Sequence, residues 1–163
     1  MINFDDAILK VSEFAPNVKT ETVSLFEATG RVIAVDINSD IDMPPFNKSA
    51  MDGYALKKED INIPLKIVGT IAAGQEPIEF SKGECVAIMT GAKVPDSANY
   101  VIPIENTTKS SDGKVKIENP TKGENIAYKA QDIKCGEQIL CKNTLLTPAH
   151  IAMLAAVGCT KPT

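Results

Sequence analysis

PPFNKSAMDGYAL, residues 44–56, is the segment from which the rest of the fold can be worked out. Its two prolines fix their φ angles and cannot donate to a β-ladder, so the residues before Asp52 do not predict a regular strand. Tyr-Ala-Leu at 54–56 does predict a strand, and Gly53 in front of it leaves room for a backbone or a ligand to approach closely. The segment therefore predicts a stiff lead-in that ends where a strand begins.

Asp52 and Gly53 have two interpretations that the residue types leave open. Asp-Gly is a strong signature of a tight hairpin turn, in which case the pair only reverses the chain. Alternatively, the lead-in presents Ser49 and Asp52 to a ligand at the start of the strand, with Gly53 as the point of close approach. Only the second interpretation gives the carboxylate a chemical role.

Short apolar segments separated by glycine, proline, asparagine and aspartate continue from about residue 43 to residue 140. This texture predicts a series of strands and not helices. Asp112-Gly113 predicts a hairpin turn in front of the last strand. The predicted strands cover residues 54–56, 65–71, 85–89, 100–104 and 115–118.

The sequence predicts one helix near each end of the chain. Asn3 can cap a helix over about residues 4–15, which carries an apolar stripe, and Pro16 would end it. Near the other end, Thr147 is a predicted N-cap and Gly158 a predicted stop for a second apolar helix.

The fold class follows from this order of elements. A turn near Gly30 and an extended piece over 31–37 follow the first helix. Helices at both chain ends with strands between them predict an α+β, β-rich fold of irregular, coiled and bifurcated sheets. We expect residues 1–42 and 141–163 to form a discontinuous helical and linking domain, and residues 43–140 to form a β-rich domain inserted into it.

Composition excludes several classes of function. The 163 residues carry a formal net charge of -4 and no clustered lysine or arginine stripe, which argues against nucleic acid as a partner. No stretch approaches the roughly 20 apolar residues of a membrane span, and the N-terminus does not resemble a secretory signal, so we expect a cytoplasmic protein. The cysteines are not spaced as metal or redox pairs, and the single histidine suits a surface or cap position. These residues are Cys85, Cys135, Cys141, Cys159 and His150.

Two further segments contain candidate site residues. CVAIMTGAKVP is an apolar run that stops at Thr90, Gly91 and Ala92, where a hydroxyl and two backbone amides can form a nest for an anion. The alternative is an ordinary passage from strand to turn. In AQDIKCGEQ, Asp132 is another candidate carboxylate, or else a turn residue that bonds to its own backbone.

Taken in order, these segments resemble the molybdopterin molybdenumtransferase family, the molybdenum insertases related to the E domain of gephyrin. The resemblance covers nearly the whole chain and corresponds to the family's N-terminal region. SAMDGYA together with IMTGA at this separation is its most specific part. The matching residues are Pro44, Pro45, Phe46, 49–55, Ala73, Gly74, 88–92, Pro95, Glu105, Asp132, Gly136 and the Leu-Thr-Pro helix up to Gly158.

The resemblance implies an activity and a set of site residues. Family members transfer molybdenum from molybdate onto adenylylated molybdopterin, with Mg²⁺ as helper, and release the adenylate. Asp52, Thr90 and Asp132 match positions that the family uses in its active-site cleft. In that role the two aspartates suit Mg²⁺ coordination or proton transfer, and Thr90 suits an anionic group. The implied substrate-binding residues are Ser49, Gly53, Gly91 and Ala92.

The resemblance also implies partners and further domains. The family forms homodimers with a cleft built from both subunits, and a molybdopterin adenylyltransferase would supply the substrate. Family members continue into a pterin-binding α/β domain and a C-terminal β domain. The helix over 4–15 would pack either against these domains or against the second subunit. We therefore expect this chain to be an N-terminal fragment that does not insert metal by itself.

The sequence departs from the family pattern at positions that carry charge. Asn99 stands where an aspartate is usual, so one acidic group is missing. Ala127 stands where an arginine is common, and Ala130 and Gln131 replace a Gly-Glu pair. A cationic contact to substrate phosphate would then come from elsewhere, and Lys129 is one candidate.

A second class of function remains open, because a fold does not fix an activity. The chain would then be a non-catalytic binding or scaffolding module of the same fold, which has no need of the Asp52 carboxylate. A hydrolase with a serine nucleophile lacks a suitably placed histidine.

Overall fold

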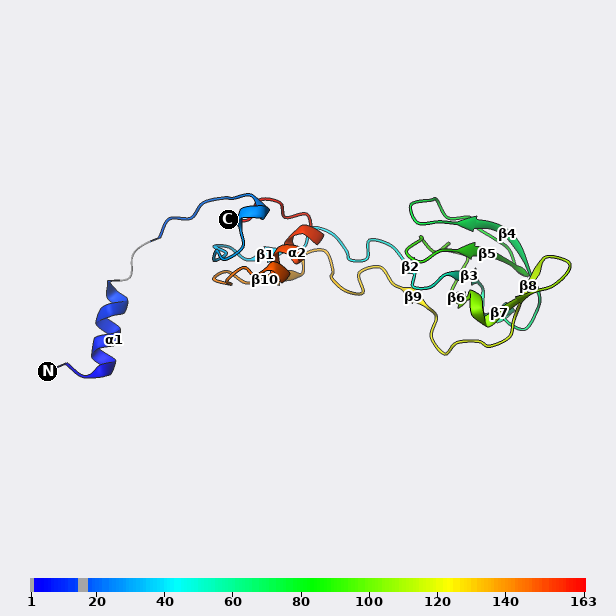
Figure 1. The fold of residues 1–163 in the computed structure, drawn as a ribbon, viewed down its shortest axis with the longest axis horizontal. Helices are drawn as coiled ribbons and strands as arrows, with labels where there is room; N and C mark the ends of the chain where they lie inside the picture. Colours follow the sequence, from blue (N-terminus) through cyan, green and yellow to red (C-terminus); the bar gives the residue numbers. More distant parts are fainter. Residues whose placement is uncertain (1, 15–17) are drawn as a thin grey trace. The chain divides into compact units, whose positions relative to one another are not determined.

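The computed structural model describes residues 2–14 and 18–163, and the chain forms two compact units (Figure 1). The first unit comprises Met1–Ile37 and Gln138–Thr163, and the second comprises Asn38–Glu137. Strands dominate, with an α-helix near each chain end, which confirms the predicted α+β class. The domain boundaries suggested by the sequence, after residue 42 and after residue 140, stay a prediction.

A six-stranded sheet forms the centre of the second unit, in the order β6-β3-β5-β4-β8-β7. β4 and β5 run parallel, and the other neighbours run antiparallel. Every strand predicted in this region is present to within one residue at each end, and the Asp112-Gly113 turn joins β7 to β8 as predicted. β7 itself was not predicted. The strands are β3 (Gly53–Leu56), β4 (Leu65–Ile71), β5 (Glu84–Ile88), β6 (Tyr100–Pro103), β7 (Thr107–Lys109) and β8 (Lys114–Ile117).

A short ladder lies beside the start of this sheet. β2 (Lys48–Ser49) pairs antiparallel with β9 (Ile126–Ala127), and Lys48 also forms an isolated antiparallel bridge with Lys93. The sequence did not predict these strands, because two residues are too few to show an alternating pattern. The ladder fixes the segment that leads into Asp52.

The core of the second unit covers both faces of the sheet. Tyr54 and Leu56 belong to one buried cluster, and Ala55 between them belongs to the other, as the alternation of side chains along a strand requires. Burial of each large apolar side chain contributes about 1.5–3 kcal/mol. One cluster comprises Tyr54, Leu56, Leu65, Cys85, Tyr100, Ile102, Val115 and Ile117, and the other comprises Ala55, Ile71, Phe80, Val86, Ile88, Ala92, Val94 and Val101.

Gly53 makes the closest backbone approach in this sheet. A Cβ atom built on Gly53 would lie 1.9 Å from the carbonyl oxygen of Ile102 on β6. The glycine is therefore required for β3 to lie against β6 in its observed register, where Gly53 faces Pro103 on one side and Ile88 on the other. The room that the sequence suggested at Gly53 is taken by a backbone carbonyl and not by a ligand.

The first unit has a smaller core between its α-helix at the C-terminal end and a 3₁₀ turn. The helix α2 (Pro148–Ala156) contacts η1 (Leu25–Glu27), and β1 (Ile37–Asn38) pairs with β10 (Gln138–Leu140). The buried residues of this core are Leu25, Ala28, Ile33, Leu140, Leu146 and Leu154.

Both predicted helices are present and capped by the predicted residues. In α1 (Phe4–Glu13), the Asn3 side chain accepts a hydrogen bond from the Asp6 amide. In α2, Thr147 and His150 form a capping box, which confirms the cap position expected for this histidine. No residue of α1 is buried, and its apolar stripe is exposed. The predicted stop at Pro16 lies outside the described residues.

The predicted extended piece over 31–37 is not one continuous strand. Val32 forms an isolated antiparallel bridge with Leu145, and β1 begins at Ile37. The Ile33 amide donates to Thr144 O, and the Ala34 amide donates to Thr163 O. The apolar pattern came from burial of Ile33 in the small core and not from a continuous ladder.

No helix of the described residues is long and apolar enough to cross a membrane.

Replacement of Gly53 by alanine tests the close approach of β3 to β6. We expect the Gly53→Ala variant to lose about 2–4 kcal/mol of stability in the second unit, since the new methyl group would overlap the Ile102 carbonyl. Urea unfolding measures the loss. Gly123→Ala is the matched control, because a Cβ there meets nothing closer than 4.0 Å, and equal stability losses in the two variants would contradict the argument.

Candidate active site

Asp52 and Thr90 form the centre of the candidate site. The Thr90 amide donates a hydrogen bond of 2.6 Å to Asp52 Oδ1, and Thr90 Oγ1 donates one of 2.7 Å to the same oxygen. Both residues are exposed. Within the described residues Oδ2 of Asp52 accepts no hydrogen bond from the protein, so it is the atom available to a ligand or a proton. The structure thus brings together two residues that the sequence singled out separately, while their roles stay predictions.

The register of the sheet explains why these residues meet. Gly53 at the start of β3 lies opposite Ile88 at the end of β5, so Asp52 falls beside the residues that leave β5. Gly91 has a φ of +81°, a left-handed conformation that turns the chain directly after Thr90. The Ile104 amide donates to Asp52 O at 3.1 Å, which fixes the backbone of Asp52 from the side of β6.

The two hydrogen bonds also set the ionisation of Asp52. The Thr90 amide, and then the Thr90 hydroxyl, hold the pKa of this carboxyl below its usual value, because both donate to the charged form. Asp52 is therefore an anion at neutral pH. An anion of this kind can accept a proton or coordinate a cation, but it repels an oxyanion.

Ser49 has a role that differs from the predicted substrate contact. Its side chain is buried, at 1% exposure, and its Oγ donates to Met51 O at 2.6 Å and accepts from the Met51 amide at 3.3 Å. A buried hydroxyl needs such partners. Ser49 therefore shapes the turn that leads to Asp52, and does not bond to Asp52 itself.

The predicted anion nest at Gly91 and Ala92 is not formed. The Gly91 amide donates to Ser49 O at 2.9 Å, and the Ala92 amide donates to Met89 O at 3.0 Å. Each amide has one hydrogen and has used it within the protein. Together with the Thr90 amide, which binds Asp52, the whole turn holds the site in place instead of receiving an anion.

Asp132 lies on a different segment of the second unit. Its amide and that of Ile133 both donate to Met43 O, which attaches this segment to the proline lead-in. Asp132 is exposed. No hydrogen bond or ion pair between described residues joins its carboxylate to Asp52 or Thr90, so the structure brings two of the three predicted catalytic residues together.

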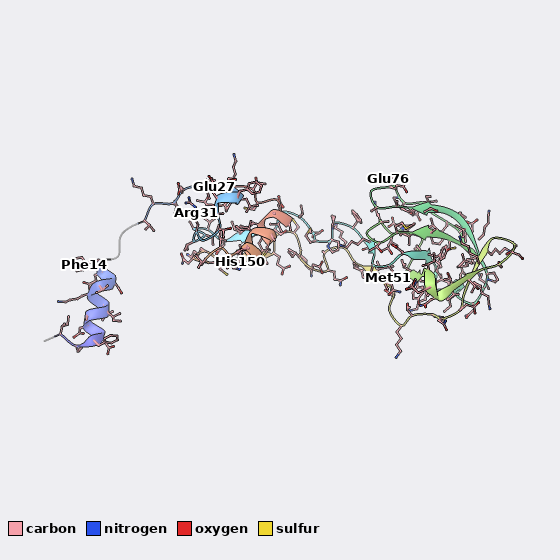
Figure 2. The ribbon with its side chains drawn as sticks, in the orientation of Figure 1. Phe14, Glu27, Arg31, Met51, Glu76 and His150 are labelled. Atoms are coloured by element: carbon pink, nitrogen blue, oxygen red, sulfur yellow. The ribbon has the colours of Figure 1, made fainter. Side chains whose placement is uncertain are left out.

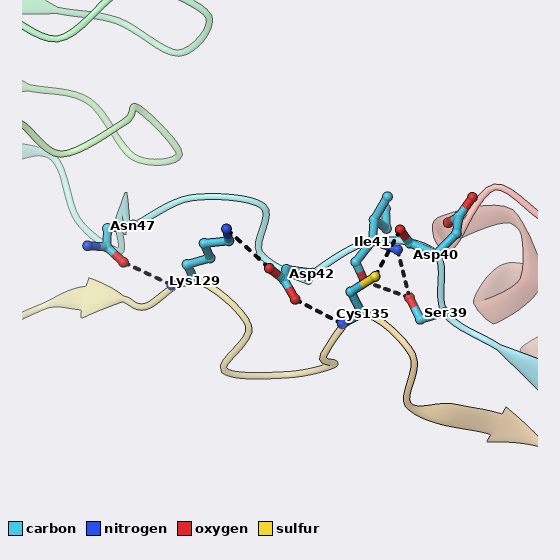
Figure 3. Close-up of polar contacts among 7 residues, drawn as sticks. All are labelled: Ser39, Asp40, Ile41, Asp42, Asn47, Lys129 and Cys135. Carbon is cyan, nitrogen blue, oxygen red and sulfur yellow. Dashed lines mark hydrogen bonds and ion pairs between the residues drawn. The ribbon is translucent and has the colours of Figure 1, made fainter.

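Lys129 is bound to a carboxylate of the protein. Its Nζ lies 3.2 Å from Asp42 Oδ2, and its amide donates to Asn47 Oδ1 at 2.9 Å (Figure 3). The Cys135 amide donates to the other oxygen of Asp42. Lys129 therefore has a counter-ion already, which disfavours it as the replacement for the arginine that is common in the family.

Asn125 is a residue that the sequence reasoning missed. Its φ angle is +54°. Its side-chain NH₂ group donates to Val101 O and to Thr121 Oγ1, at 2.8 Å each. Its backbone carbonyl accepts a hydrogen bond of 3.0 Å from the Ala50 amide. It thus holds the segment before Asp52 from the side opposite Thr90. Asparagine tolerates the left-handed conformation, but this is too weak a sequence signal to have identified it.

Three exposed apolar residues adjoin the Asp52–Thr90 pair in the chain or through a backbone hydrogen bond. Met51 and Met89 precede the two residues in the chain and are 39% and 44% exposed, and Ile104, whose amide donates to Asp52 O, is 55% exposed. Met51 is labelled in Figure 2. Apolar groups around one polar pair are typical of a surface that a ligand or another chain covers.

Mg²⁺ fits this site only as a hydrated ion with few protein ligands. Within the described residues no three aspartate, glutamate, histidine or cysteine side chains gather closely enough to hold a metal. Mg²⁺ in phosphate-handling sites often keeps its waters and uses one or two carboxylates plus the substrate. Asp52 offers one free oxygen for such an ion, whereas the predicted pairing with Asp132 is not among the contacts of the structure.

A hollow of about 490 Å³ in the first unit is separate from these residues. Its walls are mainly apolar and include the Arg31–Glu21 ion pair. None of the predicted site residues lines it, and it offers no exposed carboxylate–hydroxyl pair like that of the second unit.

The fold and the site define an α+β protein in which a six-stranded sheet presents an anionic carboxylate, held by a threonine, at one end of its central strands. The chain belongs to the family described as MoeA N-terminal region (domain I and II), which matches residues 2–158.

This chain is similar to known proteins in both sequence and structure. The chain is 37% identical to the molybdopterin molybdenumtransferase of Haemophilus influenzae and 36% identical to that of Nostoc, over 97% and 86% of its own length. It spans only 40% and 34% of those proteins. The crystal structure of the molybdopterin biosynthesis moeA protein from Pyrococcus horikoshii superposes with a TM-score of 0.81 at 38% identity, over 88% of this chain and 40% of that chain.

Removal of the Thr90 hydroxyl tests the geometry of the pair. In Thr90→Val we expect the pKa of Asp52 to rise toward its usual value and to remain below it, because the amide hydrogen bond is kept. The stabilisation by this pair is present above the usual pKa of 3.8 and is lost as the pH falls through the lowered pKa. Carboxyl NMR titration measures the pKa of Asp52 in the wild-type protein and in Thr90→Val. Thr90→Ser is the control, because it keeps the hydroxyl. An unchanged Asp52 pKa in Thr90→Val would contradict the geometry.

Proposed function

We propose that this chain serves molybdenum cofactor biosynthesis as the N-terminal part of a molybdopterin molybdenumtransferase, which moves molybdenum from molybdate onto adenylylated molybdopterin. Membership of the family supports this, and so does the activity for which its relatives are named. The single observation that carries it to the level of residues is the Asp52–Thr90 pair, an exposed and pre-oriented carboxylate at the most specific family motif.

Asp52 is proposed to handle protons or a hydrated cation. Loss of an oxo group from molybdate as water consumes protons, and a carboxylate with one free oxygen can pass protons to a bound oxyanion. Mg²⁺, when bound, would neutralise charge on substrate phosphate. Thr90 keeps Oδ1 occupied, so that Oδ2 alone faces the ligand in a fixed orientation.

Asp132 is proposed as a second, separately positioned carboxylate. Its backbone is held by Met43 O, the carbonyl directly before the proline lead-in. The lead-in therefore connects the two aspartates through a stiff segment. A substrate as long as an adenylylated pterin can contact groups that do not touch each other.

The partners follow from the same proposal. We expect the protein to act as a homodimer in the cytoplasm and to receive its substrate from a molybdopterin adenylyltransferase, without nucleic acid or membrane as partners. The exposed apolar residues beside Asp52 support a site that another surface covers during the reaction.

Asp52→Asn in the complete protein that carries these residues tests the activity. We expect cofactor formation to fall by about 10²-fold or more, because the neutral amide cannot take up a proton and is a weaker ligand for a cation than the carboxylate. The measurement is molybdenum cofactor formed from adenylylated molybdopterin and molybdate. Asp112→Asn, in the exposed β7–β8 turn, is the control and should keep full activity. Unchanged activity in Asp52→Asn would remove Asp52 as the group that handles protons or the cation.

The chain by itself should not catalyse the reaction. It covers 40% or less of the two relatives described above. Incubation with adenylylated molybdopterin, Mg²⁺ and molybdate should give cofactor only at the uncatalysed rate. Turnover close to that of the complete protein would contradict the proposed division of labour.

A further inference from the structure

Lys48 and Lys93 lie directly opposite each other on neighbouring extended segments. Their bridge is antiparallel, with the Ser49 amide donating to Ala92 O and the Val94 amide donating to Asn47 O. These bonds flank the pair, so the two lysines occupy a non-hydrogen-bonded position, where opposite side chains come closest.

Both lysine side chains leave the same face of this ladder. Side chains alternate along an extended segment, and the adjoining Ser49 and Ala92 are buried. Lys48 and Lys93 therefore point to the outer face, where Lys93 is exposed and Lys48 is partly exposed. Like charges directly opposite each other are destabilising, so the arrangement has a cost that an anion between them would offset.

Neither lysine forms an ion pair in the part of the chain that the structure describes, where the paired lysines are Lys66, Lys114, Lys116 and Lys129. The pKa of Glu79 is held below its usual value mainly by its hydrogen bonds from Ser97 and only weakly by the charge of Lys93, and its oxygens already accept from the Asp96 and Ser97 amides. On the other side of Lys48 lies Ala127 of β9, whose short side chain carries no charge.

The ladder also connects this pair to the candidate active site. Ser49 follows Lys48 and bonds to both Gly91 and Ala92, and Thr90 precedes them. Lys48 and Lys93 are thus held by the same backbone hydrogen bonds that hold the Asp52–Thr90 pair. The amides of Gly91 and Ala92, which the sequence suggested as an anion nest, already donate to carbonyl oxygens of the protein. Lys48 and Lys93 lie next to this turn and are not in ion pairs among the described residues.

We infer that Lys48 and Lys93 form a binding site for a tetrahedral dianion, either a phosphate group or molybdate, beside the Asp52–Thr90 pair. Two ammonium groups at a close cross-strand position match the charge of such an ion. That the ion belongs to a substrate of metal transfer rests on the proposed function, whereas its binding does not.

NMR titration of this chain tests the site, with sodium phosphate and sodium molybdate added separately at constant ionic strength. We expect saturable shifts of the Lys48 and Lys93 side-chain signals, and at least about fivefold weaker binding in Lys48→Gln and in Lys93→Gln. The ion that binds more tightly shows whether the site takes a phosphate group or molybdate. Lys66→Gln, which removes a lysine already paired with Glu84 in the same unit, is the matched control and should leave binding unchanged.

Equal shifts at all lysines, no saturation with either ion, or unchanged binding in both variants would overturn the inference. These outcomes are independent of catalysis. Anion binding at the lysines in a complete protein that forms no cofactor would show an anion site in a protein that lacks the proposed activity. Loss of activity in Asp52→Asn without anion binding at the lysines would leave the proposed function intact and reject this site alone.

Discussion

The backbone contact between Gly53 and the Ile102 carbonyl is the constraint on which the second unit depends. Because any side chain at position 53 would overlap that carbonyl, β3 can lie between β5 and β6 in this register only with glycine there. A slip by one residue would also move Tyr54 and Leu56 to the wrong face of the sheet. With the register fixed, Asp52 is the first residue before β3 and must lie beside the turn that leaves β5. The site is thus a consequence of how the sheet is packed.

The turn after β5 shows how completely a small site can use its backbone donors. The three consecutive amides of Thr90, Gly91 and Ala92 donate to a carboxylate and to two carbonyl oxygens of the protein. Internal bonds of this kind orient Asp52 before any ligand arrives, which is what a positioned catalytic group needs. The same bonds remove the amides from recognition. Recognition of an anion therefore falls to side chains.

The sequence predicted those parts of the fold that local pattern determines. The strands over 54–56 and 65–71 are apolar runs bounded by turn residues, and both helices carry explicit caps. β7, with its polar Thr-Thr-Lys sequence, is a strand only because the hairpin turn places it against β8. The piece over 31–37 pairs only at Val32 and from Ile37 onward, while Ile33 between them is buried in the small core. For the site, the family resemblance implied that Asp52 and Thr90 belong together. The bonds of the Gly91 amide to Ser49 O and of the Ala50 amide to Asn125 O could not be predicted, because these partners are far apart in the sequence.

In a site of this kind, the groups that bind an anionic substrate must be different from the anionic carboxylate. Asp52 is held as an anion by Thr90, and at close range it repels both molybdate and phosphate. An anionic substrate can approach Asp52 only if nearby positive charges attract it more strongly than Asp52 repels it. Lys129 does not supply such a charge, because it is already paired with Asp42. The Lys48–Lys93 pair supplies that charge from the same ladder that holds the carboxylate. The anion can then be held by lysines at one end of the turn while a proton or a hydrated cation is managed at the other, without either group having to serve both purposes.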